Sequence, residues 1–170
     1  MVFTPLSNNV VKKMVAKIGR NRDNVKYRVS ADLARGVNQI YRSWIEQLVK
    51  KSKAITENGR RKVVTRRDVT AAFESMGKEP RIMMRIEEDP DTNAGWVWPK
   101  APFERNIKTY LGPGFRLGRA SSHLIMLITK HYIMTHMRGA LGIQIVRGRK
   151  TVNHQSMVQT KAICNGTRFL

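Results

Sequence analysis

The sequence predicts an all-α chain in which one helical unit occurs twice. Apolar residues recur with the 3.6-residue period of an α-helix along two long segments, residues 30–58 and residues 121–146. A shorter amphipathic segment stands before and after each long one, and basic loops separate them. Hydrophobic residues make up 41% of the chain, which is enough to build a core. A long helix with two short neighbours exposes a broad apolar stripe, so each unit needs a partner of the same kind.

The first unit is predicted over residues 1–80 and opens with a short helix. A Ser or Asn cap begins the stretch SNNVVKKMVAKIG, and Gly19 is predicted to end the helix. Four apolar residues share one face at helical spacing. They are Val11, Met14, Val15 and Ile18.

The long helix of this unit is predicted to start at a Ser30 cap and to end at Gly59. The basic segment RRKVV follows it. Thr65 and Asp68 then have the spacing of a capping box, which predicts a third helix that ends at Gly77. The joint between these two helices is therefore a short extended segment rich in positive charge.

A linker is predicted between the units. Residues 1–80 carry 18 basic and 7 acidic side chains, residues 81–101 carry 3 and 4, and residues 102–170 carry 11 and 1. The middle segment is rich in Pro, Asp, Asn and Gly, which is typical of an ordered linker or arm. Trp96 and Trp98 within it are expected to dock on one of the units, since a free linker rarely displays two indoles.

The second unit repeats the order of elements. Ser121 or Ser122 is predicted to cap its long helix, and Asn153 to cap its closing helix. Gly139 and Gly142 stand inside the long helix, where each costs about 1 kcal/mol relative to alanine. We expect another helix to approach closely at both glycines.

The formal net charge of +20 makes a polyanion the expected partner, with nucleic acid first and an anionic membrane surface second. The longest apolar run contains Lys130, His131, His136 and Arg138, so it predicts a buried helix and not a bilayer span. Cys164 is the only cysteine, which favours a reducing compartment, and no secretory signal pattern opens the sequence.

No catalytic, metal or cofactor pattern is found, and neither an enzyme nor a small-molecule substrate is expected. The histidines show no ligand spacing with Cys or carboxylates, and Met126, Met134 and Met137 are interpreted as core residues. The sequence has no nucleophile elbow and no phosphate-binding glycine loop.

The stretch GRRKVVTRRDV resembles the second loop and third-helix start of a core histone, and YRVS before the first long helix resembles the first loop. The resemblance implies two histone folds paired head to tail as a pseudo-heterodimer. The fusion of two such units is similar to the histone doublets of giant DNA viruses. FRLGRASS in the second unit resembles histone 2A, which would make the first unit histone 2B-like. RKVVTRRDV also suits histones of the central tetramer, and residues 121–148 lack the acidic side chains of a histone 2A face.

The resemblance implies that the paired loops and the first helices hold the phosphates of double-stranded DNA, without reading sequence. Arg28, Arg61 and Arg116 are the candidates for insertion into the minor groove. Arg35, Arg42, Lys130 and Arg138 are interpreted as solvated face residues. The predicted DNA-binding residues are Lys12, Lys13, Arg20, Arg22, Lys26, Arg28, Ser30, Arg60, Arg61, Lys62, Thr65, Arg66, Arg105, Lys108, Arg116, Arg119, Arg147, Arg149, Lys150 and Thr151.

The implied function is architectural: packaging of viral double-stranded DNA in nucleosome-like particles together with a second histone pair or doublet of central-tetramer type. A virion, a viral factory or a host nucleus is the implied location. Three other functions stay open: a histone-fold transcription-factor subunit, a central-tetramer-type doublet, and a structured-RNA protein. An interfacial membrane protein ranks last, because the basic clusters stand in loops and not along one helix face.

Overall fold

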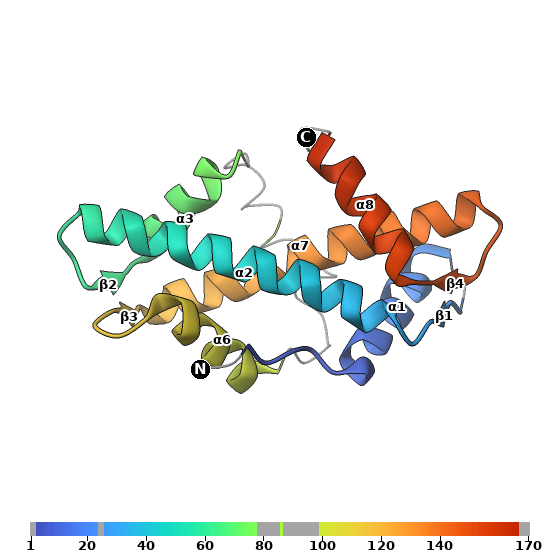
Figure 1. Cartoon of the computed structure of the whole chain (residues 1–170), viewed down its shortest axis with the longest axis horizontal. Helices are drawn as coiled ribbons and strands as arrows, with labels where there is room; N and C mark the ends of the chain where they lie inside the picture. Colours follow the sequence, from blue (N-terminus) through green and yellow to red (C-terminus); the bar gives the residue numbers. More distant parts are fainter. Residues whose placement is uncertain (1–2, 24–25, 78–85, 87–98, 167–170) are drawn as a thin grey trace.

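The computed structural model describes residues 3–23, 26–77, 86 and 99–166, with the backbone alone for residues 20–23 and 164–166. Two long helices, α2 (Leu33–Asn58) and α7 (Arg119–Val146), cross near their middles (Figure 1). The ring of Trp44 on α2 stacks on Tyr132 of α7 at the crossing, with centroids 3.7 Å apart.

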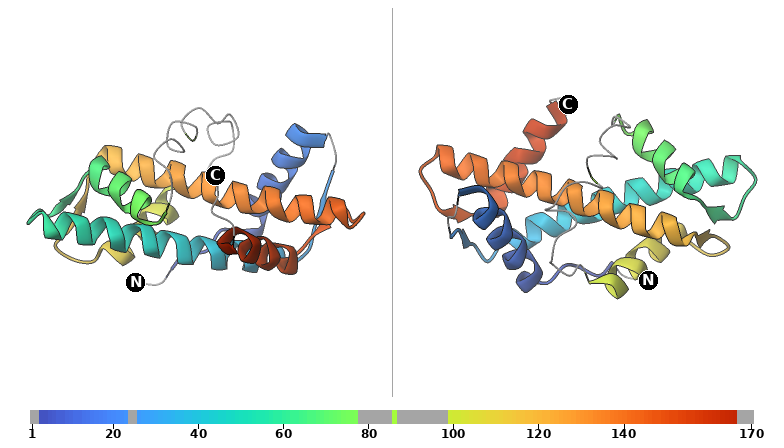
Figure 2. Two further views of the ribbon diagram at one scale, coloured as in Figure 1. Left: turned by 90° about the horizontal axis from the view of Figure 1, so that it is seen from above. Right: turned by 180° about the vertical axis from the view of Figure 1, so that it is seen from behind.

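Four shorter helices flank the two long ones. The pair α1 and α6 lies on one side of the crossed helices, and the pair α3 and α8 lies on the other (Figures 1 and 2). Each unit therefore has the order short helix, long helix, short helix, and the predicted all-α fold class with two paired units is confirmed. The bounds are α1 Asn8–Asp23, α3 Arg66–Ser75, α6 Lys100–Leu111 and α8 His154–Gly166.

Two short parallel ladders join the units at opposite ends of the molecule (Figure 1). At one end β1 (Arg28–Val29) pairs with β4 (Thr151–Val152). At the other end β2 (Val63–Val64) pairs with β3 (Arg116–Leu117). The first loop of each unit thus lies beside the second loop of the other. In this head-to-tail pairing, each end of the molecule is formed by two segments that are far apart in the sequence.

The core fills the space between the crossed helices. The four apolar residues predicted on one face of α1 are all at most 1% exposed, and Val69, Ala72 and Phe73 of α3 are at most 3% exposed. Ile86, from the predicted linker, is also buried in this core. Trp96 and Trp98 lie outside the described residues. Within the described part of the chain, no helix is both long and apolar enough to cross a membrane.

Three sequence-based details differ in the structure. The first helix does not end at Gly19 but continues to Asp23, since a buried glycine inside a helix costs only about 1 kcal/mol and does not by itself end it. Lys130 is not a solvated face residue: it is 9% exposed, and burial together with the nearby Lys17 charge lowers its pKa. The prediction for Gly142 is wrong as well, since an added Cβ there would meet nothing within 4 Å.

Gly139 behaves as predicted. A Cβ at this position would lie 2.5 Å from Cγ2 of Thr160 on α8, far inside normal contact distance. Thr160 is 3% exposed and its hydroxyl donates to the Ser156 carbonyl at 2.8 Å, so it cannot easily move away. Only a glycine allows α7 and α8 to pack this closely.

Candidate nucleic-acid interface

The two paired-loop ends are the strongest candidates for an anion-binding surface. The β1–β4 end brings together predicted residues from both units: Arg28 from the first and Arg147, Arg149, Lys150 and Thr151 from the second. The Arg28 amide donates to the Lys150 carbonyl at 2.8 Å, which fixes the two basic segments side by side. All five side chains are exposed.

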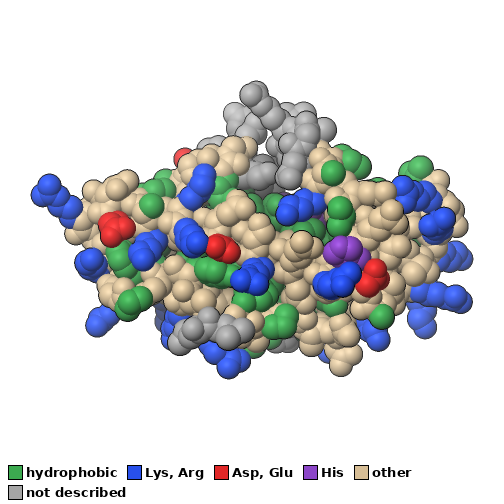
Figure 3. Space-filling model, viewed as in Figure 1, with side chains coloured by type: hydrophobic (Ala, Val, Ile, Leu, Met, Phe, Trp, Pro, Cys, Tyr) green, Lys and Arg blue, Asp and Glu red, His purple; other side chains and the backbone are tan. Residues whose placement is uncertain are grey.

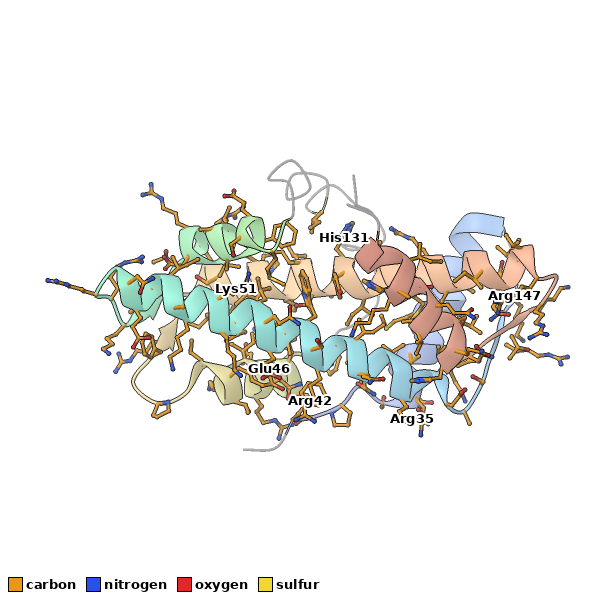
Figure 4. All side chains as sticks on the ribbon, turned by 45° about the horizontal axis from the view of Figure 1, so that its top comes forward. Arg35, Arg42, Glu46, Lys51, His131 and Arg147 are labelled. Atoms are coloured by element: carbon orange, nitrogen blue, oxygen red, sulfur yellow. The ribbon has the colours of Figure 1, made fainter. Side chains whose placement is uncertain are left out.

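The β2–β3 end gathers the equivalent residues. Arg60, Arg61 and Lys62 come from the first unit and Arg116 from the second, and all four are exposed. The Arg116 amide donates to the Lys62 carbonyl at 2.8 Å, in the same geometry as at the other end. Lys and Arg side chains are visible at both ends of the molecule in Figure 3, and Arg147 marks the β1–β4 end in Figure 4.

Both basic loops leave their long helix by the same left-handed turn. The turn residue is Arg60 at φ 53° in one loop and Gly148 at φ 65° in the other. The next residue, Arg61 or Arg149, then donates its amide back to a carbonyl of the long helix at 3.0 or 2.8 Å. A residue with a side chain costs about 1–2 kcal/mol in this conformation. The backbone at Arg60 is therefore strained, whereas at Gly148 the same turn has no such cost.

Ser30 and Ser121 do not cap the long helices as predicted. The helix α2 begins after Asp32 and α7 begins after Gly118. Instead, the Ser30 hydroxyl donates to the Val152 carbonyl at 2.9 Å, and the Ser121 hydroxyl donates to the Val64 carbonyl at 2.8 Å. Each serine therefore ties its own unit to the last ladder residue of the other unit.

Arg61 is engaged inside its own unit. Its guanidinium donates to both carboxylate oxygens of Asp68, at 2.9 and 2.5 Å. The same carboxylate accepts the Thr65 amide at 2.8 Å, which confirms the predicted capping box. Burial opposes ionisation of Asp68, but the bonds from Arg61 and Thr65 outweigh it and hold the pKa of Asp68 well below its ordinary value. Arg61 thus closes the loop onto α3, although its side chain is still 44% exposed.

The second unit caps the same helix position without a carboxylate. The Ser156 amide donates to the Asn153 side chain at 2.9 Å, and the Asn153 amide donates back to the Ser156 hydroxyl at 3.2 Å, so the predicted Asn153 cap is confirmed. Ser156 occupies the place that Asp68 has in the first unit. No acidic side chain in the described part of the chain pairs with Arg149. Its guanidinium is therefore available to an external anion.

Lys62 is also partly held by its own protein. Its ammonium lies 4.8 Å from the centroid of the Phe115 ring, and Lys53 lies at the same distance. A cation–π contact of this kind is worth about 0.5–1 kcal/mol at an exposed site. Lys53 was not predicted from the sequence. Its place in the last two turns of α2 was the only available signal.

The first helices carry the remaining predicted cations. Lys12 and Lys13 on α1 and Arg105 and Lys108 on α6 are exposed. Lys26, Arg66 and Arg119 are exposed near the loop ends, and Thr65 is half-buried in the capping box. The side chains of Arg20 and Arg22 lie outside the described residues. Arg35 and Arg42 are exposed on α2, as predicted, and the Arg42 guanidinium lies 5.9 Å from the Phe3 ring (Figure 4).

An N-terminal strap, residues 3–6, joins the units on the α1–α6 side. The Asn106 side chain of α6 accepts the Thr4 amide at 2.7 Å and donates to its carbonyl at 2.8 Å. Asn38 of α2 makes the same pair of bonds with Leu6, at 2.6 and 3.0 Å. This contact was not predicted from the sequence. A polar residue such as Asn106 between apolar neighbours on a buried helix face is the signal that could have predicted it.

The described residues hold no group of three or more His, Cys, Asp or Glu side chains that could bind a metal ion. His136 is buried and its Nδ1 lies 2.8 Å from the Tyr132 carbonyl, so it takes part in packing within α7. The exposed groups that the loops bring together are cations and hydroxyls. Such a set binds anions by charge and hydrogen bonding.

No protein-family model matches the chain, and neither does any curated protein. A search of solved structures matches the histone from Methanopyrus kandleri, with a TM-score of 0.64 and 15% sequence identity. The match covers 88% of this chain and 91% of that one, so it includes parts of both units. The fold is a histone fold. At this identity the likeness concerns the fold alone, and the histone fold explains why each long helix needs the other unit.

Proposed function

We propose that the protein is an architectural double-stranded DNA-binding protein, a histone doublet that packages DNA without reading its sequence. One observation supports this most strongly: the head-to-tail pairing brings the basic first loop of each unit beside the basic second loop of the other, at both ends of the molecule. Two separated cationic edges on a rigid body suit a polyanion that passes along them, because each neutralised phosphate releases condensed counterions.

The side chains suggest how the DNA would be held. Exposed Arg28 and Arg116, the first residues of β1 and β3, occupy equivalent places at the two ends and are suited to a narrowed minor groove. The exposed cations of α1 and α6 would hold the phosphates between the two ends. Since Arg61 is engaged by Asp68, Arg149 is the better candidate of the two for a direct phosphate contact.

The proposal includes a viral origin and a particle shared with a second histone pair of central-tetramer type. The histone 2B-like and 2A-like assignment of the units, the virion or nuclear location and the absence of catalysis belong to the same proposal. Basic residues are present in both units, with 18 before the linker and 11 after it, which supports the DNA-binding part of the proposal. Each unit can thus contribute to DNA binding.

The deciding experiment is digestion with micrococcal nuclease after reconstitution on DNA, with and without a doublet that supplies the central histones. A discrete protected fragment only in the presence of both proteins would support the outer-pair role. Protection by this chain alone would show wrapping without a partner. A featureless smear in both samples would overturn the packaging function.

A further inference from the structure

A cleft of about 540 Å³ opens on the side of the molecule opposite α1 and α6, between the two closing helices. Its lining comes from α2 and α3 of the first unit and from α7 and α8 of the second. In Figure 1 these closing helices lie above the crossing of α2 and α7 and lean toward each other. The volume falls in the range of sites that bind small ligands or a few side chains of a peptide.

The floor of the cleft is aromatic but largely closed: Trp44 and Ile40 are each 4% exposed, and most of the exposed lining is polar. Trp44 and Tyr132 form their stacked pair there, next to Ile40 and the half-buried Met76. Since the two rings belong to different units, the floor exists only in the paired molecule. Flat aromatic and flexible thioether surfaces accept aliphatic or aromatic side chains with little geometric demand.

The walls are cationic. Lys51 on α2 and Lys161 on α8 line the cleft, together with the hydroxyls of Ser43 and Ser75. None of the described residues that line it is acidic. The Lys51 ammonium donates to the Ser75 carbonyl at 3.2 Å and to the Ser75 hydroxyl at 3.5 Å, and keeps capacity for one further bond.

Two carboxylates stand next to lining residues in the sequence but do not line the cleft. Glu46 is paired with Lys50 at 2.7 Å, and Glu74 is exposed on α3. The two lysines of the walls therefore face a space with apolar and hydroxyl groups and without compensating charge among the described lining residues. Charge complementarity favours an anionic occupant.

We propose that this cleft binds an acidic peptide segment of another protein. The carboxylates of the peptide would lie between Lys51 and Lys161, and an aliphatic or aromatic side chain beside them would cover the Trp44–Tyr132 pair. A second copy of this chain is disfavoured, because each copy carries a net charge of +20. Duplex DNA is disfavoured too, since the paired loops with their cations are at the two ends of the molecule, away from the cleft (Figure 1). The inference does not rest on the proposed packaging function.

The test uses the full chain and a short fluorescent peptide in which Glu alternates with Leu and Phe, followed by anisotropy at physiological salt. The double variant K51E and K161E should weaken peptide binding about tenfold or more, since two attractions become repulsions. The matched control, R35E with R67E, makes the same charge change on exposed positions of α2 and α3 outside the cleft and should stay within about twofold.

The variant Ser43→Trp fills the cleft without changing charge and keeps the test valid if the charge variants unfold. It should also abolish peptide binding while duplex DNA binding, measured in the same buffer, stays unchanged. An equal loss in the cleft and control variants would overturn the inference, and so would full displacement of the peptide by duplex. Failure of duplex binding with intact peptide binding would instead contradict only the packaging function.

Discussion

The β1–β4 and β2–β3 ends share one backbone geometry but use their second-loop arginines differently. Arg61 is held by Asp68 and closes its loop onto α3, whereas Arg149 has no acidic partner among the described residues. The same loop position therefore supports the fold in the first unit and is available to an anion in the second. Equivalent places in a pseudo-symmetric pair need not have the same role.

The largest difference should appear in stability. Replacing Asp68 by Ala leaves the Thr65 amide without its acceptor and removes both bonds of Arg61, so unfolding in urea should show a loss of about 2–3 kcal/mol. The matched Ser156→Ala change removes only neutral bonds and should cost about 1 kcal/mol. Equal losses would mean that the two ends are closed equally well.

The same pair predicts an acid dependence in the first unit. Because the folded-state pKa of Asp68 lies below its unfolded value of about 3.9, its stabilisation is complete at neutral pH and is lost as the pH falls below about 4. The wild type should therefore exceed Asp68→Asn in unfolding free energy at pH 7, and the gap should narrow at pH 3. An unchanged gap would contradict the ionised pair.

The two glycines of α7 test how closely the second unit is packed. Gly139→Ala should destabilise the protein by about 1–3 kcal/mol, because its Cβ would overlap Thr160. Gly142→Ala has free space and should instead stabilise α7 by up to about 1 kcal/mol. Thermal melts of both variants would compare them, and the same sign for both changes would contradict this packing of α7 on α8.

The smallest effect concerns DNA. Arg149→Ala should lower duplex affinity severalfold and reduce the slope of log affinity against log salt by about 0.9, the value for one lost phosphate contact. Arg61→Ala should change the slope less and stability more, since Asp68 loses its guanidinium. Titrations at several salt concentrations would separate the two variants. A larger slope change for Arg61 would reverse the comparison.

Local patterns predicted local structure well. The buried face of α1, the Thr65–Asp68 box and the Asn153 cap were all correct, because each depends on residues within one or two helical turns. The approach of α8 to Gly139 was also predicted, since a glycine inside a helix has few other reasons to be there. Gly142 has the same local pattern and no such neighbour, so the pattern alone could not separate them.

The candidate interface was predicted in outline but not in its individual roles. The basic loops are at the predicted joints, yet Ser30 and Ser121 are not helix caps, because each bonds a carbonyl of the other unit. The burial of Lys130 and its nearness to Lys17 of α1 were not predicted, because α1 lies far away in the sequence. Such contacts have no signature at any fixed spacing.

By itself, the sequence determined that the chain is all-α, that one unit occurs twice and that basic loops flank each long helix. These properties follow from periodicity, capping and charge, which act over a few residues. Only the tertiary structure decided which loops meet, that Arg61 is held while Arg149 is free of acidic partners among the described residues, and that Trp44 and Tyr132 share a cleft with Lys51 and Lys161. The physical reason is that these outcomes depend on which surfaces two long helices bury against each other, and that packing joins residues from opposite halves of the chain.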